Sequence, residues 1–200
     1  MSQSEYQLSL PARTETDGDP AVAALLGKAK AGIGIGMIPN MYANMANAPG
    51  LLETYLSGYA AFRSESGLSA AEQETVFLTI SRVNGCSYCV TAHSTIADMT
   101  KLRVEIDISE QDVARAKKDM PCQIVPDPKL DALATFTLAM LETRGLPSHA
   151  QVEAFLGAGY TEQHVLFVVL ALAVKTISNY SNHLFHTPVD AAFVGRSWEQ

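Results

Sequence analysis

The sequence predicts an all-α protein, and two observations carry that prediction. Apolar residues recur at helical spacing in eight segments, and alternating strand patterns are absent. Several segments also begin with a Ser-x-x-Glu/Gln box or a near match to it, a signature of a helix start. At 200 residues and 48% hydrophobic composition, one domain can bury a sizeable core without disulfides.

Residues 1–20 form a polar arm that is expected to be ordered only when docked on a partner subunit, and residues 21–200 form the single helical domain. The helix boxes pair Ser69 with Glu72, Ser109 with Asp112 and Ser148 with Gln151. Helices are predicted over residues 21–31, 49–64, 69–83, 86–99, 109–119, 128–143, 148–159 and 161–185.

The stretch "GIGIGM", Gly32 to Met37, has the glycine content of a phosphate-binding loop. It follows a helical pattern rather than a strand, and it leads into Pro39-Asn40 rather than straight into a helix. The prediction is therefore a plain interhelical loop.

Charge and hydropathy exclude several functions. The net charge is −7 and Lys and Arg form no cluster, which argues against a nucleic-acid surface. The longest apolar run, Val165 to Val174, is about half of a membrane span and predicts a buried helix. The N-terminus lacks the pattern of a secretory signal, so we expect a cytoplasmic, reducing setting and no membrane partner.

A register shift of 90 residues aligns "EQETVF", Glu72 to Phe77, with "EQHVLF", Glu162 to Phe167. The same register places His183 opposite His93. This predicts a duplicated helical unit, with a first repeat at about 49–105 and a second at about 130–187 that lacks the cysteines of the first.

The candidate site lies in "SRVNGCSYCVTAHSTIA", Ser81 to Ala97. On a helix, Cys86, Cys89 and His93 fall within an arc of about 60° and share one face. Asn84, before Gly85, is the expected N-cap of that helix, which would put both thiols in a first turn where N–H groups favour a thiolate.

Two thiols so placed can cycle between dithiol and disulfide, one attacking a peroxide or disulfide and the other resolving the product. His93 is placed to accept or relay a proton. Glu74 lies in the preceding, largely apolar helix, and it either extends to the surface or pairs with a group such as His93, whose tautomer it would then fix.

Zinc is the main alternative to redox chemistry. A structural zinc site needs four ligands, and Cys122 has no second Cys or His nearby, so we assign it to packing or a loop. A three-ligand site of Cys86, Cys89 and His93 with water is the remaining metal hypothesis. The matching functional hypothesis is a metal-binding or redox-sensing module that does not turn over a substrate. A satisfied core histidine and a solvated helix carboxylate are the simplest alternatives for His93 and Glu74.

The spacing of Glu74, Cys86, Cys89 and His93 resembles the AhpD-like alkylhydroperoxidase group of the carboxymuconolactone decarboxylase superfamily. The "IPN" loop at residues 38–40 and the terminal "NHLFHTPVD" extend the likeness. The resemblance implies an AhpD-like helical bundle and a homo-oligomer, either a trimer or a hexamer. It implies a cofactor-independent peroxidase, or a disulfide reductase serving a peroxiredoxin, that uses a Glu–His proton relay.

The resemblance further implies a hydroperoxide substrate and a thiol or dithiol donor, such as a peroxiredoxin or thioredoxin-like protein. By analogy with that group Cys89 attacks and Cys86 resolves, whereas proximity to the helix start favours Cys86 as the attacking thiol. Tyr88 stands where the AhpD type has a histidine, which removes one proton carrier.

Overall fold

The computed structural model describes residues 5–33, 36–99, 106–118, 120 and 123–194, and in these ranges it contains nine α-helices and no strand. The predicted all-α class is confirmed, and each of the eight predicted helices is present. The helices are α1 (Pro20–Ile33), α2 (Asn40–Met45), α3 (Pro49–Glu65), α4 (Ala70–Val83), α5 (Ser87–Met99), α6 (Glu110–Lys117), α7 (Pro128–Glu142), α8 (His149–Gly157) and α9 (Glu162–Phe185).

The short helix α2 is the element that the sequence did not predict. It has six residues and no side-chain hydrogen bond at its start, so neither periodicity nor a capping signal marks it. The capping boxes at Ser69, Ser109 and Ser148 all form, and Thr161 makes a further one with His164 at the start of α9.

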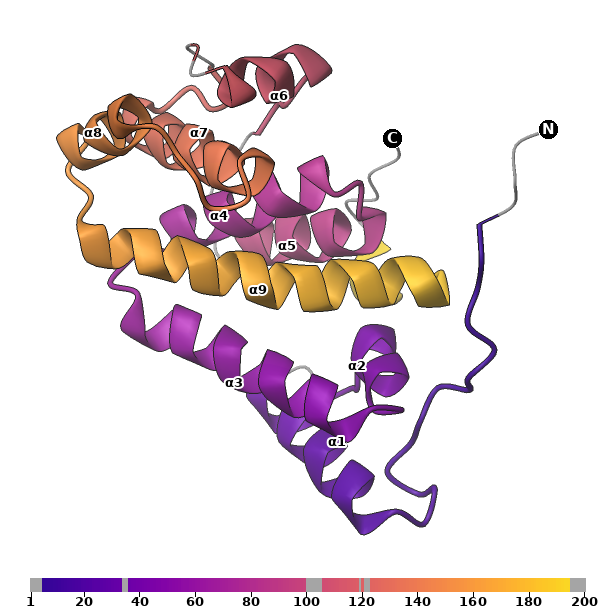
Figure 1. Cartoon of the computed structure of the whole chain (residues 1–200). Helices are drawn as coiled ribbons and strands as arrows, with labels where there is room; N and C mark the ends of the chain where they lie inside the picture. The colour runs from indigo at the N-terminus through magenta and orange to yellow at the C-terminus, as the bar shows by residue number, and fades with distance from the viewer. Residues whose placement is uncertain (1–4, 34–35, 100–105, 119, 121–122, 195–200) are drawn as a thin grey trace.

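Helices α4, α5 and α9 form a middle layer between α6–α8 on one side and α1–α3 on the other (Figure 1). The centre of α4 is buried from Glu72 to Ser81, because its neighbours cover its whole circumference. Phe77 and Ile80 belong to the larger of two apolar cores, and Leu78 belongs to the smaller. Glu74 lies on this helix, so its carboxylate is carried into the interior.

Helix α9 contains the apolar run predicted to be a buried helix, but only one face of it is buried. Val168, Ala171 and Val174 are covered, whereas Leu166 and Val169 are exposed. By length and composition α9 could also cross a membrane, a test that the core helix of a soluble protein passes as well. It is the only such helix among the described residues.

From residue 5 onward, the N-terminal arm packs against its own chain, whereas the sequence led us to expect order only on a partner subunit. The backbone N–H of Leu8 donates to the carbonyl of Leu184 (2.8 Å), and the side-chain amide of Asn47 donates to the carbonyl of Pro11 (2.8 Å). The last carbonyls of a helix lack hydrogen-bond partners within the helix. The end of α9 therefore offers acceptors to the backbone N–H groups of the arm.

The two predicted repeats differ in shape. The first contains α4 and α5, separated at Gly85, whose φ is +66°. The aligned part of the second is the uninterrupted helix α9, on which His183 is exposed while its counterpart His93 is buried. The duplication itself stays a prediction.

Gly58 sets the spacing between α3 and α9, and we expect Gly58→Ala to destabilise the protein. An added Cβ would lie 2.9 Å from Cγ2 of Val174, a stiff and buried side chain. The overpacking cost of about 1–3 kcal/mol exceeds the ~1 kcal/mol that alanine gains in a helix. Thermal unfolding measures the difference.

Gly50→Ala is the matched control, because its added Cβ meets nothing within 4 Å. It should leave stability unchanged or raise it slightly. If Gly58→Ala behaves like Gly50→Ala, the close packing of α3 on α9 is wrong. The result matters for the site because the next residues, Tyr59 and Lys175, both line the cavity described below.

Candidate active site

The turn before α5 places the two cysteines. The carbonyl of Cys86 accepts a hydrogen bond from the N–H of Val90 (3.0 Å), so Cys86 occupies the N-cap position and Cys89 lies in the first turn. The prediction that Asn84 is the N-cap of this helix is wrong. Asn84 is the C-cap of α4 because the left-handed Gly85 separates it from α5, and its side-chain amide donates to Asn179 of α9 (2.9 Å).

Glu74 and His93 meet in the interior, as the sequence predicted for the case in which Glu74 is paired. His93 Nδ1 lies 2.8 Å from one oxygen of Glu74, and Arg63 donates to the other oxygen at 2.5 Å. Burial alone would raise the pKa of Glu74, but the bonds and charges of His93 and Arg63 together hold it below its ordinary value. Glu74 is therefore an ionised group that orients the imidazole.

The pairing with Glu74 fixes the tautomer of His93. An ionised carboxylate can only accept, so Nδ1 carries the hydrogen and Nε2 keeps a free lone pair. The ring packs on Phe77, with centroids 4.9 Å apart. Burial, followed by the charge of Lys175, lowers the pKa of His93, so the imidazole is neutral at pH 7 and available as a base.

Both cysteines are free thiols and both are buried. The amide of Asn182 donates to Sγ of Cys89 at 3.3 Å and lies 3.9 Å from Sγ of Cys86. The pKa of Cys86 is raised, first by its hydrogen bond with Cys89. Burial acts to raise the pKa of Cys89 as well, but the hydrogen bond from Cys86 and the charge of Lys175 outweigh it and hold that pKa well below its usual range. Cys89 is therefore the thiol of the pair that ionises more readily.

Lys175 is a candidate site residue that the sequence did not predict. Its side chain is buried, and its ammonium group has no hydrogen-bond partner among the described residues. It lies 5.5 Å from the centroid of the Phe77 ring. The available signal was a lone charge immediately after the apolar run that ends at Val174, a costly position for a lysine without a role.

A cavity of about 310 Å³ brings Cys89, His93 and Lys175 to one space. Its wall is largely apolar and includes four tyrosines and a phenylalanine. The ring residues that line it are Tyr42, Tyr55, Tyr59, Tyr88 and Phe193. A sulfur nucleophile, a base and a cation thus face a small apolar chamber, which suits a small organic substrate that develops negative charge as it reacts.

Tyr88 has a structural role. Its hydroxyl donates to Asp190 (2.5 Å), and the other oxygen of Asp190 accepts from the backbone N–H of Asn40 (3.0 Å). Asp190 thus ties both Tyr88 and the "IPN" loop to the terminal "NHLFHTPVD". Burial, then the bond to Asp190, raises the pKa of Tyr88, so its proton stays in that bond rather than serving His93.

The metal hypothesis finds no support in the described residues, where no three His, Cys, Asp or Glu side chains converge as ligands. Cys122 lies outside the described residues.

Comparisons with known proteins bear on the family and the fold. Residues 49–105, which contain all four predicted site residues, match the model of the carboxymuconolactone decarboxylase family. The chain is similar in structure to a peroxidase-related protein from Ralstonia eutropha described as an alkylhydroperoxidase AhpD core, at 19% identity and a TM-score of 0.73, with 95% of this chain and 97% of that chain covered.

A peroxidase-related protein from a Silicibacter species follows, at 17% identity and a TM-score of 0.68 over 97% of this chain and 96% of that one. A cysteine variant of the debrominase Bmp8 in complex with 2,3,4-tribromopyrrole is similar at 13% identity and a TM-score of 0.66, covering 96% and 97%. No curated protein matches the sequence. The predicted family resemblance and the AhpD-like fold are confirmed.

Proposed function

We propose that this chain is an AhpD-like member of the carboxymuconolactone decarboxylase superfamily, and that it is a cofactor-independent thiol peroxidase that reduces small organic hydroperoxides with Cys86 and Cys89. The observation that carries the proposal is the position of Cys89. Its sulfur faces an aromatic cavity together with His93 and Lys175, and Glu74 holds His93 from behind.

The first step forms a sulfenic acid on Cys89. His93 Nε2 takes the thiol proton, and the thiolate attacks one oxygen of the hydroperoxide, so that the O–O bond breaks and an alkoxide leaves. Lys175 stabilises the negative charge on sulfur and then on the leaving oxygen. His93, whose pKa is lowered, returns the proton to give the alcohol.

The second step closes the disulfide. Cys86 Sγ attacks the sulfur of the sulfenic acid, its proton leaves with the hydroxide as water, and the Cys86–Cys89 disulfide forms. One hydroperoxide and two thiols therefore give one alcohol, one water and one disulfide. Two electrons pass from the two sulfur atoms to the O–O bond.

A Cys86→Ser substitution should stop the reaction after the first step. With no resolving thiol, the sulfenic acid on Cys89 accumulates, and a sulfenic-acid-specific dione reagent labels that residue in a peptide mass spectrum. Label on Cys86 of a Cys89→Ser variant, with none on Cys89 of Cys86→Ser, would reverse the roles. Label on neither would remove the peroxidase proposal.

The aromatic cavity favours one second candidate, removal of halogen from a small aromatic ring. The debrominase Bmp8 binds a tribromopyrrole, and the tyrosines at 42, 55 and 59 here form a wall suited to a flat ring. The same dithiol would supply two electrons, converting an aryl bromide to the arene, bromide and a proton. Bromide release from 2,3,4-tribromopyrrole by the reduced protein tests this candidate.

Direct reduction of a protein disulfide is less favoured by the geometry, because Cys86 and Cys89 are 1% and 2% exposed and a second protein would have to reach them.

We also propose a cytoplasmic, homo-oligomeric protein, a trimer or hexamer. Leu166 and Val169 on α9 are exposed apolar side chains that a second copy would cover, and sedimentation analysis tests this assembly.

A further inference from the structure

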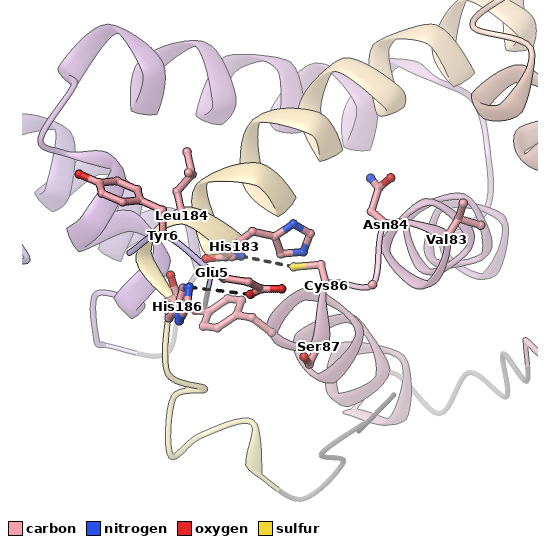
Figure 2. Close-up of a pocket in the computed structure, with 13 residues that line it drawn as sticks. Glu5, Tyr6, Val83, Asn84, Cys86, Ser87, His183, Leu184 and His186 are labelled. Atoms are coloured by element: carbon pink, nitrogen blue, oxygen red, sulfur yellow. Dashed lines mark hydrogen bonds and ion pairs between the residues drawn. The ribbon is translucent and has the colours of Figure 1, made fainter. Parts of the chain in front are cut away.

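The two cysteines face different spaces. Cys89 lines the aromatic cavity and Cys86 does not, whereas Cys86 lines a second, larger groove to which Cys89 does not contribute. We call this second space the outer groove. It is lined by Glu5, Tyr6, Val83, Asn84, Gly85, Cys86, Ser87, Tyr88, Asn182, His183, Leu184, His186 and Thr187, and Figure 2 shows its position. Tyr88 lines both spaces and forms part of the wall between them.

The outer groove differs from the cavity in size and chemistry. Its volume is about 810 Å³, and polar side chains dominate it, among them the carboxylate of Glu5, the imidazoles of His183 and His186, and the amide of Asn84. The N-terminal arm forms one of its sides, with Glu5 3.9 Å from His186 (Figure 2). The side-chain amide of Gln7 donates to the last carbonyl of α9, that of Phe185 (3.2 Å).

We propose that the Cys86–Cys89 disulfide is reduced from the outer groove, by a polar thiol of amino-acid or short-peptide size that attacks Sγ of Cys86, while oxidation takes place at Cys89 in the aromatic cavity. This inference rests on the proposed function, because it assigns the reducing half of the same cycle. It separates the hydroperoxide and the electron donor in space.

The groove favours a small donor over a protein. Cys86 is 1% exposed, so a broad protein surface cannot bring a thiol to it without displacing the arm. A volume of about 810 Å³ lies within the range of small-molecule sites. The carboxylate of Glu5 and the polar groups of His183 and Asn84 can pair with the amino and carboxylate groups of such a donor.

The chemistry of exchange favours attack at Cys86. The donor thiolate forms a bond to Sγ of Cys86, the disulfide bond breaks, and its electron pair goes to Cys89, the better leaving group because its pKa is lower. A second donor thiolate then attacks the donor sulfur of this mixed disulfide and releases the thiolate of Cys86, which takes a proton. In sum, two donor thiols become one donor disulfide and the protein dithiol is restored.

Three tryptophan substitutions test the two-sided arrangement. Ser87→Trp fills the outer groove from an exposed position, Ile96→Trp fills the aromatic cavity, and Ser64→Trp on α3 is a matched control that lines neither space. Each protein is oxidised with diamide, which needs no peroxidase activity, and mixed rapidly with glutathione as the probe. Quenching with an alkylating reagent and mass spectrometry then give the rate at which thiols return.

We expect Ser87→Trp to slow reduction by glutathione by about tenfold or more, with oxidation by cumene hydroperoxide within about twofold of wild type. Ile96→Trp should show the opposite pattern, and Ser64→Trp should match wild type in both reactions. Circular dichroism of each variant checks the fold.

Equal reduction rates in Ser87→Trp and wild type would overturn the inference. Faster reduction by thioredoxin than by glutathione at equal thiol concentration would also overturn it, because the donor would then be a protein. If cumene hydroperoxide fails to oxidise wild type while the diamide-formed disulfide behaves as expected, the proposed peroxidase function fails and the reducing groove stands.

Discussion

A Cys89→Ser substitution is expected to lower hydroperoxide reduction by about a thousandfold or more, because it removes the attacking thiolate. The groups around Cys89 stabilise a negative charge on its sulfur. The amide of Asn182 donates to Sγ at 3.3 Å, and the hydrogen bond from Cys86 and the charge of Lys175 lower the pKa of Cys89. A serine hydroxyl stays protonated in the same place and cannot attack the O–O bond at a useful rate.

The measurement is the consumption of cumene hydroperoxide with excess dithiothreitol as reductant. Cys86→Ser is the informative comparison, since it keeps Cys89 and, assayed without dithiothreitol, should still consume one equivalent of peroxide. Equal, slow consumption by wild type and Cys89→Ser would show that the cysteine pair does not reduce peroxide.

A Lys175→Met substitution is expected to raise stability and lower activity together. The ammonium group of Lys175 is buried and has no hydrogen-bond partner among the described side chains, so an apolar side chain of similar length should stabilise the fold by about 1 kcal/mol or more. Activity should fall by about tenfold or more at neutral pH, because less Cys89 is then ionised and the leaving oxygen loses its cation.

The sign of the pH effect follows from the same contact. In the wild type the lowered pKa of Cys89 makes its thiol easier to ionise, and the gain matters most at neutral and mildly acidic pH. Loss of Lys175 raises that pKa, so the activity lost is greatest at acidic pH and the pH–rate profile moves to alkaline values. Denaturant unfolding and the pH dependence of single-turnover oxidation give the two readouts.

Lys129→Met is the matched control, because this lysine is exposed, pairs with Glu72 at 2.9 Å and lines neither the aromatic cavity nor the outer groove. It should leave the pH profile unchanged and should not raise stability. A Lys175→Met variant that loses both stability and activity, with an unmoved pH profile, would show that the lysine is merely structural.

Much of the fold could be predicted because local signals and packing agree. The capping box at Ser69 and the apolar circumference of α4 place the start and the burial of this helix, and with them the burial of Glu74. The fixed spacing to His93 then predicts their meeting across the turn at Gly85, which the structure places at 2.8 Å.

The missing parts of the site come from elements remote in sequence. Arg63 reaches Glu74 from α3 and Lys175 reaches the cavity from α9, so no local spacing connects either residue with the cysteines. Asn84 caps the end of α4 rather than the start of α5 because Gly85 adopts a positive φ. The amino-acid letters alone do not specify that backbone angle. The arm is held in part by a backbone hydrogen bond to the carbonyl of Leu184. A backbone acceptor of this kind leaves no pattern of side chains in the sequence.

The proposed function requires that Cys86 and Cys89 form the redox couple that reduces a hydroperoxide. The most direct test is titration of the fully reduced protein with cumene hydroperoxide under anaerobic conditions, with thiols, alcohol and the Cys86–Cys89 peptide disulfide counted at each point. We expect one alcohol to form and two thiols to be lost per chain, one at Cys86 and one at Cys89. Alcohol formed without loss of these thiols, or thiols unchanged by the peroxide, would contradict it.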